Sequence, residues 1–435
     1  MVRLSARVLQ KAVIIEASRT PFATSGSHYK NLMPHDLQRA ALLDLVKKTK
    51  VPPSEIEHFV SGTVIQEVKT SNVAREALLS ANLPNSIPCH TVTQACISSN
   101  QAISSIVDQI NSGQIECGVA GGVDFMSDVP IRYNKSSRMK MLASQKAKGA
   151  AAQAGLLLTL LKNIHKPELP AVAEFSTNET MGHSADRLCA AFSVSRSDQD
   201  EYAARSHNFA DKASKEGLLE DRMKNYFVPG LKEPVSTDNG IRPSTAAQMG
   251  KLRAAFIKGP QGTITAANAS FLTDGASAAL IASEAKAKKL GMKPKAYLRD
   301  YVFVSQDPKD QLLLGPAYAI TKLLHKTGLK LTDFDVFELH EAFAGQILAN
   351  LRALNSDYFC KNHIKASGKV GELPMDKLNL WGGSLSIGHP FGATGVRLVI
   401  TAANRLQKEG GKRALVAACA SGGLGHAMVV EKYGN

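Results

Sequence analysis

The chain has 435 residues and a mass of 46.5 kDa, which corresponds to about two to four domains and allows a large core. Its 44% hydrophobic and 21% charged residues exclude a disordered, collagen-like or coiled-coil protein. The net charge of +14 indicates an anionic partner, but one Trp and nine Tyr argue against stacking on single-stranded nucleic acid, so no nucleic-acid partner is expected.

The chain opens with Arg3, Arg7 and Lys11 and has no acidic residue before Glu16. This composition is typical of a short organelle-import presequence, although a frayed end with chance charges would look the same. The final residues, KYGN, are not the peroxisomal address S-K-L, so a peroxisomal location is the less favoured one.

Short β-branched runs then alternate with helical patterns. Strands are predicted at 12–17, 58–65, 87–93 and 116–126. Helices are predicted after Asp36, which can act as an N-cap, at 72–80, and after Cys96. This alternation predicts a layered α/β fold with helices packed against a sheet.

The segment 131–167 holds much of the positive charge and no acidic residue. Its basic residues are Arg132, Lys135, Arg138, Lys140, Lys146, Lys148, Lys162 and Lys166. Within it lies an uncharged run at 149–161, which as a helix would rise about 20 Å and is too short to span a bilayer. We expect contact with a membrane surface or a partner subunit, or a helix packed on its own protein with a solvated flank.

The order of elements recurs late in the chain, with strands predicted at 295–304, 335–339 and 414–418. The repetition indicates an internal duplication of one α/β unit. The predicted organisation is therefore a first half formed by 11–130 and 264–290, an inserted domain at 131–263, and a second half at 291–435.

Cys96 lies where a predicted strand meets a helix, a position in which free backbone N–H groups favour a thiolate. A buried core cysteine is the alternative for any single Cys. The six cysteines show no C-x-x-C pair, so free thiols and no metal site are predicted.

Three further motifs carry polar groups after strands or at glycine-rich turns: His389 in GHPFGATG, Cys419 in CASGG, and His340 in HEAF. A histidine held beside a thiol can take its proton or bind a developing oxyanion. Each motif taken alone could equally be a tight turn.

Together and in this order, the motifs resemble the thiolase family. The resemblance extends to RTPF at 19–22, AGG at 120–122, NAS at 268–270 and TDG at 273–275. It implies a thiolase-like, duplicated five-layered α-β-α-β-α core with an inserted loop domain. Finer detail, including the His of HEAF, is similar to the long-chain mitochondrial subgroup of the family.

The resemblance implies thiolysis of 3-ketoacyl-CoA by coenzyme A, which is a substrate, with no bound cofactor. Cys96 would form the acyl-enzyme, His389 would activate it, and Cys419 would act as the second acid and base. One oxyanion site would use His389 and a water held by His340. The other would use the backbone N–H groups of Cys96 and Ser421. Two residues depart from many thiolases, His340 replacing Asn and Ser421 replacing Gly.

The resemblance also places Arg242, Ser270 and Met181 at the CoA site. It implies a thiolase-type homodimer, a hydratase/dehydrogenase α subunit as partner, and a mitochondrial location on the matrix side of the inner membrane. The segment 131–167 would contact membrane or partner and shape a channel for long acyl chains, or attract CoA phosphates.

Two other functions stay open. One is a short-chain or biosynthetic acetoacetyl-CoA thiolase, since the chemistry is reversible. The other is a non-catalytic basic scaffold, for which Cys96 would be dispensable. A 3-ketoacyl synthase is disfavoured because the second Cys has no role in its two-His site.

Overall fold

The computed structural model describes residues 10–434 except for 147–148, 164–165 and 171–172. The strands are β1 (Ala12–Arg19), β2 (Ala23–Thr24), β3 (His58–Gly62), β4 (Cys89–Val92), β5 (Cys117–Asp124), β6 (Thr273–Ser283), β7 (Ala296–Ser305), β8 (Val336–Leu339), β9 (Arg413–Ala420) and β10 (Leu424–Lys432). They hydrogen-bond in the order β4-β3-β5-β6-β1-β7-β10-β9-β8, and β2 pairs with β6.

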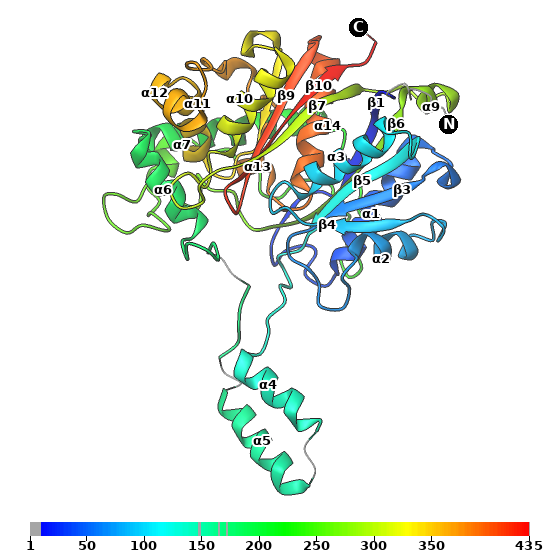
Figure 1. Cartoon of the computed structure of the whole chain (residues 1–435), viewed down its shortest axis with the longest axis vertical. Helices are drawn as coiled ribbons and strands as arrows, with labels where there is room; N and C mark the ends of the chain where they lie inside the picture. Colours follow the sequence, from blue (N-terminus) through cyan, green and yellow to red (C-terminus); the bar gives the residue numbers. More distant parts are fainter. Residues whose placement is uncertain (1–9, 147–148, 164–165, 171–172, 435) are drawn as a thin grey trace, which may run out of the picture.

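The helices surround and separate the two halves of this sheet (Figure 1). They are α1 (Pro34–Thr49), α2 (Val73–Ser80), α3 (Ser98–Asn111), α4 (Lys135–Ser144), α5 (Ala150–Asn163), α6 (Met181–Ala191), α7 (Arg196–Lys215), α8 (Ala246–Met249), α9 (Glu284–Lys289), α10 (Gly315–Thr327), α11 (Ala344–Leu354), α12 (Asp357–Phe359), α13 (Ser384–Ile387) and α14 (Thr394–Glu409).

The strand pairing repeats in the two halves. In the first half β3 is parallel to β5, and β5, β6 and β1 then pair antiparallel. In the second half β8 is parallel to β9, and β9, β10 and β7 follow in the same antiparallel sense. The halves join where β1 meets β7 at Val13–Tyr297 and Ile14–Ala296. The internal duplication predicted from the sequence is therefore present in the topology.

The helices and the two halves of the sheet form five layers, and three buried hydrophobic clusters lie between these layers. The first joins α1 and α2 to one face of the first half, the second holds α3 and α14 between the two halves, and the third joins α10 and α11 to the far face of the second half. One strand can contribute to two clusters because successive residues along a strand point to opposite faces of the sheet. On β9, for example, Leu415 belongs to the third cluster and Val416 to the second.

The N-terminus of α1 differs from the prediction. Met33 is the N-cap, and Asp36 is the third helical residue, whose carboxylate accepts a hydrogen bond from the Met33 backbone N–H at 3.0 Å. The helix begins earlier because Pro34 suits the first helical position, where no N–H is needed. An acidic residue in the first turn still favours the positive end of the helix dipole.

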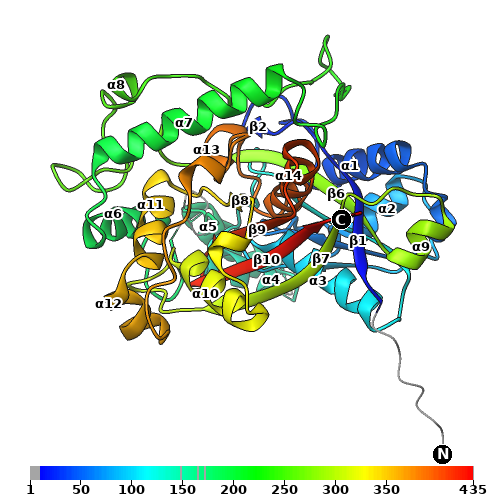
Figure 2. The same cartoon turned by 90° about the horizontal axis from the view of Figure 1, so that it is seen from above.

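The described part of the segment 131–263 contains helices α4 to α8 and no named strand. Helices α4 and α5 pack against each other and stand away from the rest of the molecule (Figure 1), whereas α7 runs beside α13 (Figure 2). Of the helices in the described ranges, none has both the length and the hydrophobicity needed to cross a bilayer. The exact domain boundaries stay a prediction.

The two halves come closest where the end of β5 meets the loop before α14. A Cβ atom on Gly122 would lie 1.8 Å from the Gly392 carbonyl oxygen. Asp124 accepts hydrogen bonds from the backbone N–H groups of Val64, Ile65 and Gly392. The AGG motif and the GHPFGATG motif are therefore two sides of one contact.

We expect Gly122→Ala to destabilise the protein by about 1–3 kcal/mol, because the added methyl group meets backbone that cannot rotate away. The thermal unfolding midpoint, compared at one scan rate, measures this loss. Gly250→Ala is the matched control, since its new Cβ would make only ordinary contacts at 3.4 Å or more. Equal midpoints for the two variants would contradict the proposed crowding.

Candidate active site

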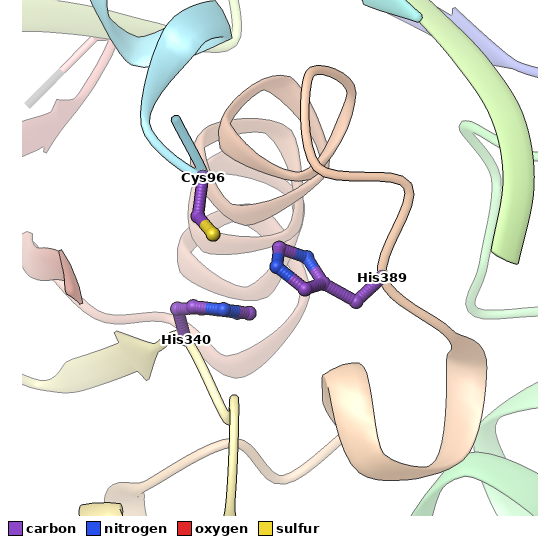
Figure 3. A group of neighbouring side chains, drawn as sticks. All are labelled: Cys96, His340 and His389. Atoms are coloured by element: carbon purple, nitrogen blue, oxygen red, sulfur yellow. The ribbon is translucent and has the colours of Figure 1, made fainter. Parts of the chain in front are cut away.

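Three distant segments bring Cys96, His340 and His389 together (Figure 3). Cys96 precedes α3, His340 directly follows β8, and His389 lies between α13 and α14. Their sulfur and nitrogen ligand atoms lie within 4.8 Å of one another, and the two imidazole centroids are 4.0 Å apart. The contact between the halves thus places a thiol beside two imidazole rings.

The Cys96 thiol is protonated at rest. Burial is the largest influence and raises its pKa to about 12, while the backbone N–H groups of Ser421 and of Cys96 itself oppose the shift. The prediction that the helix N-terminus would give a lowered pKa is wrong in net effect, because desolvation outweighs the donors. A thiolate at this position therefore requires a base that takes the proton directly.

His389 is oriented as such a base. Its Nδ1 lies 2.7 Å from the Thr394 hydroxyl oxygen, and that hydroxyl donates its own hydrogen to the Pro390 carbonyl oxygen at 3.0 Å. Thr394 can therefore only accept from His389, so Nδ1 carries the hydrogen and Nε2 has a free lone pair. Burial lowers the His389 pKa to about 3, which keeps the ring neutral near pH 7.

His340 is also neutral. Its Nδ1 lies 2.9 Å from the Ser384 hydroxyl oxygen, which accepts a hydrogen bond from the Arg397 guanidinium at 3.1 Å. Burial, followed by the charges of His389 and Arg397, lowers the His340 pKa well below its usual value. Within the described residues, the buried Nε2 atoms of both His340 and His389 lack a hydrogen-bond partner, so both are available to bind substrate or water.

Cys419 belongs to the same group. It lies near the end of β9, and burial is the main cause of its raised pKa, with the charge of Cys96 as the next cause. A negative charge on Cys96 would therefore make the Cys419 thiol harder to ionise. Ser421 follows in the turn after β9, and its backbone N–H opposes the rise in the Cys96 pKa. The structure thus places Cys96, His340 and His389 in one group, and electrostatic interactions link Cys419 and Ser421 to Cys96.

The three residues expected to bind CoA do not all line the same cavity. Arg242 lines a cavity of about 410 Å³, together with His207, Ser244, Gln248, Phe271 and other residues. Ser270 adjoins Phe271 and donates its backbone N–H to the Ala342 carbonyl oxygen at 2.9 Å. Met181 begins α6 and packs against the third cluster. Of these three residues, only Arg242 is among those lining the cavity.

A second cavity of about 730 Å³ reaches Gln94, two residues before Cys96, and is lined also by Phe303, Tyr318 and Lys322. Neither cavity is lined by described residues of 131–167, which had been expected to shape an acyl channel.

The spacing of Cys96, His340 and His389 could also hold a soft metal ion. The expectation of no metal stays a prediction.

Sequence reasoning missed the residues that hold these groups in place. Thr394 sets the tautomer of His389, Ser384 positions His340, and Glu174 accepts from Ser421. Thr394 belongs to the GHPFGATG motif, and its spacing from His389 was an available signal. No local signal pointed to Glu174, because its partner Ser421 lies 247 residues away in the chain.

Comparison with known families decides the assignment. Residues 12–285 match the thiolase N-terminal domain, and residues 292–432 match the thiolase C-terminal domain. The chain belongs to the thiolase family. It is therefore an acyltransferase of the thiolase type.

Similarity to individual thiolases extends over nearly the whole chain. It is 61% identical over 425 residues to the mitochondrial trifunctional enzyme subunit beta of Rattus norvegicus, covering 98% of this chain and 89% of the relative. It is 58% identical over 423 residues to a probable 3-ketoacyl-CoA thiolase of Caenorhabditis elegans, covering 97% and 94%. The five-layered thiolase fold expected from the sequence is confirmed.

Two solved structures share this fold. Human mitochondrial 3-ketoacyl-CoA thiolase superposes with a TM-score of 0.82 at 29% identity, covering 98% of this chain and all (100%) of the other. The Bacillus anthracis acetyl-CoA acetyltransferase gives 0.83 at 30% identity with the same coverage. Because both kinds of thiolase fit equally well, the fold alone does not determine the length of the acyl substrate.

In this thiolase we expect Thr394→Val to slow alkylation of Cys96 by iodoacetamide by about tenfold to a hundredfold, because a well-oriented general base contributes about 10²–10⁴-fold. The variant lacks the hydroxyl oxygen that accepts from His389 Nδ1–H. His389 can then adopt the other tautomer, with its hydrogen on Nε2. The rate is measured at pH 7.5 from the mass of the Cys96 peptide. Thr401→Val, buried on the same helix, is the control, and equal rates for both variants would refute the role of Thr394.

Proposed function

We propose that the chain cleaves long-chain 3-ketoacyl-CoA with coenzyme A, giving acetyl-CoA and an acyl-CoA shortened by two carbons. The observation that carries this proposal is a buried Cys96 thiol beside the free Nε2 lone pair of a neutral His389. The relatives support it, since they are a trifunctional enzyme subunit beta and a probable 3-ketoacyl-CoA thiolase.

In the first half-reaction, His389 Nε2 takes the Cys96 proton and the thiolate attacks the C3 carbonyl carbon. The bond between C2 and C3 then breaks, leaving an acyl group on Cys96 and the enolate of acetyl-CoA. The Cys419 thiol protonates C2 of that enolate, and acetyl-CoA leaves. The proton on His389 and the thiolate of Cys419 are retained for the next step.

In the second half-reaction, the Cys419 thiolate takes the proton of the incoming CoA thiol. The CoA sulfur attacks the Cys96 thioester, and the Cys96–acyl bond breaks to release the shortened acyl-CoA. Cys96 then recovers its proton from His389. Both sulfurs and both imidazoles end as they began, so the cycle balances without a bound cofactor.

Negative charge develops on two different oxygens, and the site offers two sets of donors. After taking the Cys96 proton, His389 can donate Nε2–H to one oxygen, assisted by a water held at His340 Nε2. The backbone N–H groups of Cys96 and Ser421 serve the other oxygen. His340 suits the first role because burial keeps it neutral and its Nε2 has no partner among the described residues, so it can hydrogen-bond a water.

The 410 Å³ cavity is the proposed CoA site. Arg242 supplies a cation for the phosphates, and its backbone N–H is fixed by donation to His207 Nδ1 at 3.1 Å. Phe271 adds an apolar wall, while Ser270 and Met181 would act at the pantetheine arm and the thiol tunnel. We assign Ser270 and Met181 by their match to the family motifs.

The proposed assembly follows the relatives named above. A subunit called beta implies a hetero-oligomer, and we propose an α subunit with hydratase/dehydrogenase activity bound to a thiolase-type homodimer. The trifunctional enzyme beta subunits are mitochondrial, which supports a mitochondrial location, and we place the enzyme on the matrix side of the inner membrane.

Helices α4 and α5 form the proposed surface for membrane contact. Apolar side chains are exposed on this pair and near its base, including Met139, Leu142, Leu157, Leu158 and Leu169. Lys135, Lys146 and Lys166 are exposed beside them. Apolar groups flanked by lysines suit the boundary of an anionic bilayer.

The function is tested by steady-state thiolysis of 3-ketoacyl-CoA substrates from C4 to C16. We expect the highest kcat/KM for long chains and a loss of turnover of at least about 10³-fold in Cys96→Ser, which removes the nucleophile. Cys89→Ser, a change at another Cys of the same half, should keep its activity. Best activity at C4 would favour the short-chain alternative, and turnover by Cys96→Ser would end the catalytic proposal.

We expect deletion of 135–162 to abolish sedimentation with vesicles containing phosphatidylserine, because the deletion removes the exposed apolar and basic groups of α4 and α5. Thiolysis of a soluble short-chain substrate checks that the shortened chain folds. A double Lys212→Glu and Lys215→Glu variant on α7 controls for general charge. Unchanged vesicle binding by the deletion variant would refute the membrane contact.

A further inference from the structure

The turn between β9 and β10 is bound by a carboxylate that no motif identified. The Ser421 hydroxyl and the Gly422 backbone N–H both donate to the same oxygen, Glu174 Oε1, at 2.5 and 3.0 Å. Glu174 is 9% exposed, and both bonds are partly buried. Ser421 stands where many thiolases have Gly, and a Gly could make only one of the two bonds.

Glu174 reaches this turn from the inserted segment, 247 residues away in the chain. It lies in a short turn between α5 and α6 that is closed by a bridge between Ala173 and Thr180. The Glu174 backbone N–H donates to the Glu179 carbonyl oxygen at 2.9 Å, and Asn178 N–H donates to the Glu174 carbonyl oxygen at 2.8 Å. The carboxylate is therefore presented from an ordered support.

The same turn is held on its other side by the end of β7. Gln306 N–H donates to the Gly423 carbonyl oxygen at 2.8 Å, and a Cβ on Gly423 would lie 2.4 Å from the Gln306 carbonyl oxygen. Gly422 and Gly423 both have positive φ, at 84° and 69°, which lets the chain reverse sharply. Gln306 and Glu174 thus hold the turn from opposite sides.

We propose that Glu174 is a positioning residue for the second oxyanion site, and that Ser421 is the partner through which it acts. By accepting from the Ser421 hydroxyl and the Gly422 N–H, Glu174 fixes residue 421, whose own backbone N–H acts on Cys96. The inference rests on the proposed thiolase function. It makes the inserted segment part of the catalytic geometry in addition to any role in CoA or membrane contact.

The role is geometric and not electrostatic. The negative charge of Glu174 adds to the causes that raise the Cys96 pKa, so this charge opposes formation of the thiolate. A neutral acceptor of the same shape should therefore serve as well as the carboxylate. Glu174→Gln keeps a carbonyl oxygen for both donors, whereas Glu174→Ala removes it.

The experiment measures kcat and the KM for CoA in the full-length protein with a 3-ketoacyl-CoA substrate. Removing one oxyanion donor costs about 10²–10³-fold in kcat, and a misplaced donor should cost less. We expect Glu174→Ala to lower kcat by about tenfold or more with KM changed less than about twofold. Glu174→Gln should stay within about threefold of the wild type, and Ser421→Gly should lie between the two.

Coupling between the two residues gives a second readout. Since Ser421 acts through Glu174, adding Ser421→Gly to Glu174→Ala should lower kcat little further. Glu179→Ala is the matched control, because it removes a carboxylate from the same turn whose partners are His183 and Arg187. Its kcat should be that of the wild type.

Three results would overturn the inference: an unchanged kcat in Glu174→Ala, an equal loss in Glu179→Ala, or no rescue by Glu174→Gln. Thermal midpoints measured in parallel separate a folding defect from loss of positioning. If the wild type itself fails to cleave 3-ketoacyl-CoA, the proposed function fails. If the wild type is active and Glu174→Ala is equally active, only the positioning role fails.

Discussion

The site depends on one contact between the duplicated halves, the approach of the end of β5 to the loop that carries His389. Asp124 holds that loop through the Gly392 N–H and holds the 63–65 segment through two further backbone bonds. Glycine at 122 and 392 allows the backbones to touch. Without this contact, Cys96 from one half and His389 from the other would not share a pocket.

Burial at this junction controls the chemistry. It raises the pKa of both Cys96 and Cys419 and lowers the pKa of both His340 and His389, so four titratable groups are neutral together. Neutral groups cost less to bury than ions. Charge then arises only when a proton moves from sulfur to imidazole, next to donors that are already in place.

The sequence indicated the groups that react but not those that orient them. The strands could be predicted because hydrophobic periodicity is a local signal, whereas Cys96, His340, His389 and Cys419 were identified only because their motifs, taken together and in order, resemble the thiolase family. The sign of the Cys96 pKa shift could not be predicted, since desolvation depends on segments from the whole chain. Glu174 was missed for the same reason, because its partner lies 247 residues away.

The protonated state of Cys96 also affects how fast oxidants can damage its sulfur. Peroxide and other oxidants attack a thiolate far faster than a thiol, and sulfinic and sulfonic products are irreversible for an ordinary cysteine. A resting sulfur with a pKa of about 12 is almost entirely thiol near neutral pH. A raised pKa therefore slows oxidation of the idle enzyme, and during turnover the acyl group covers the sulfur.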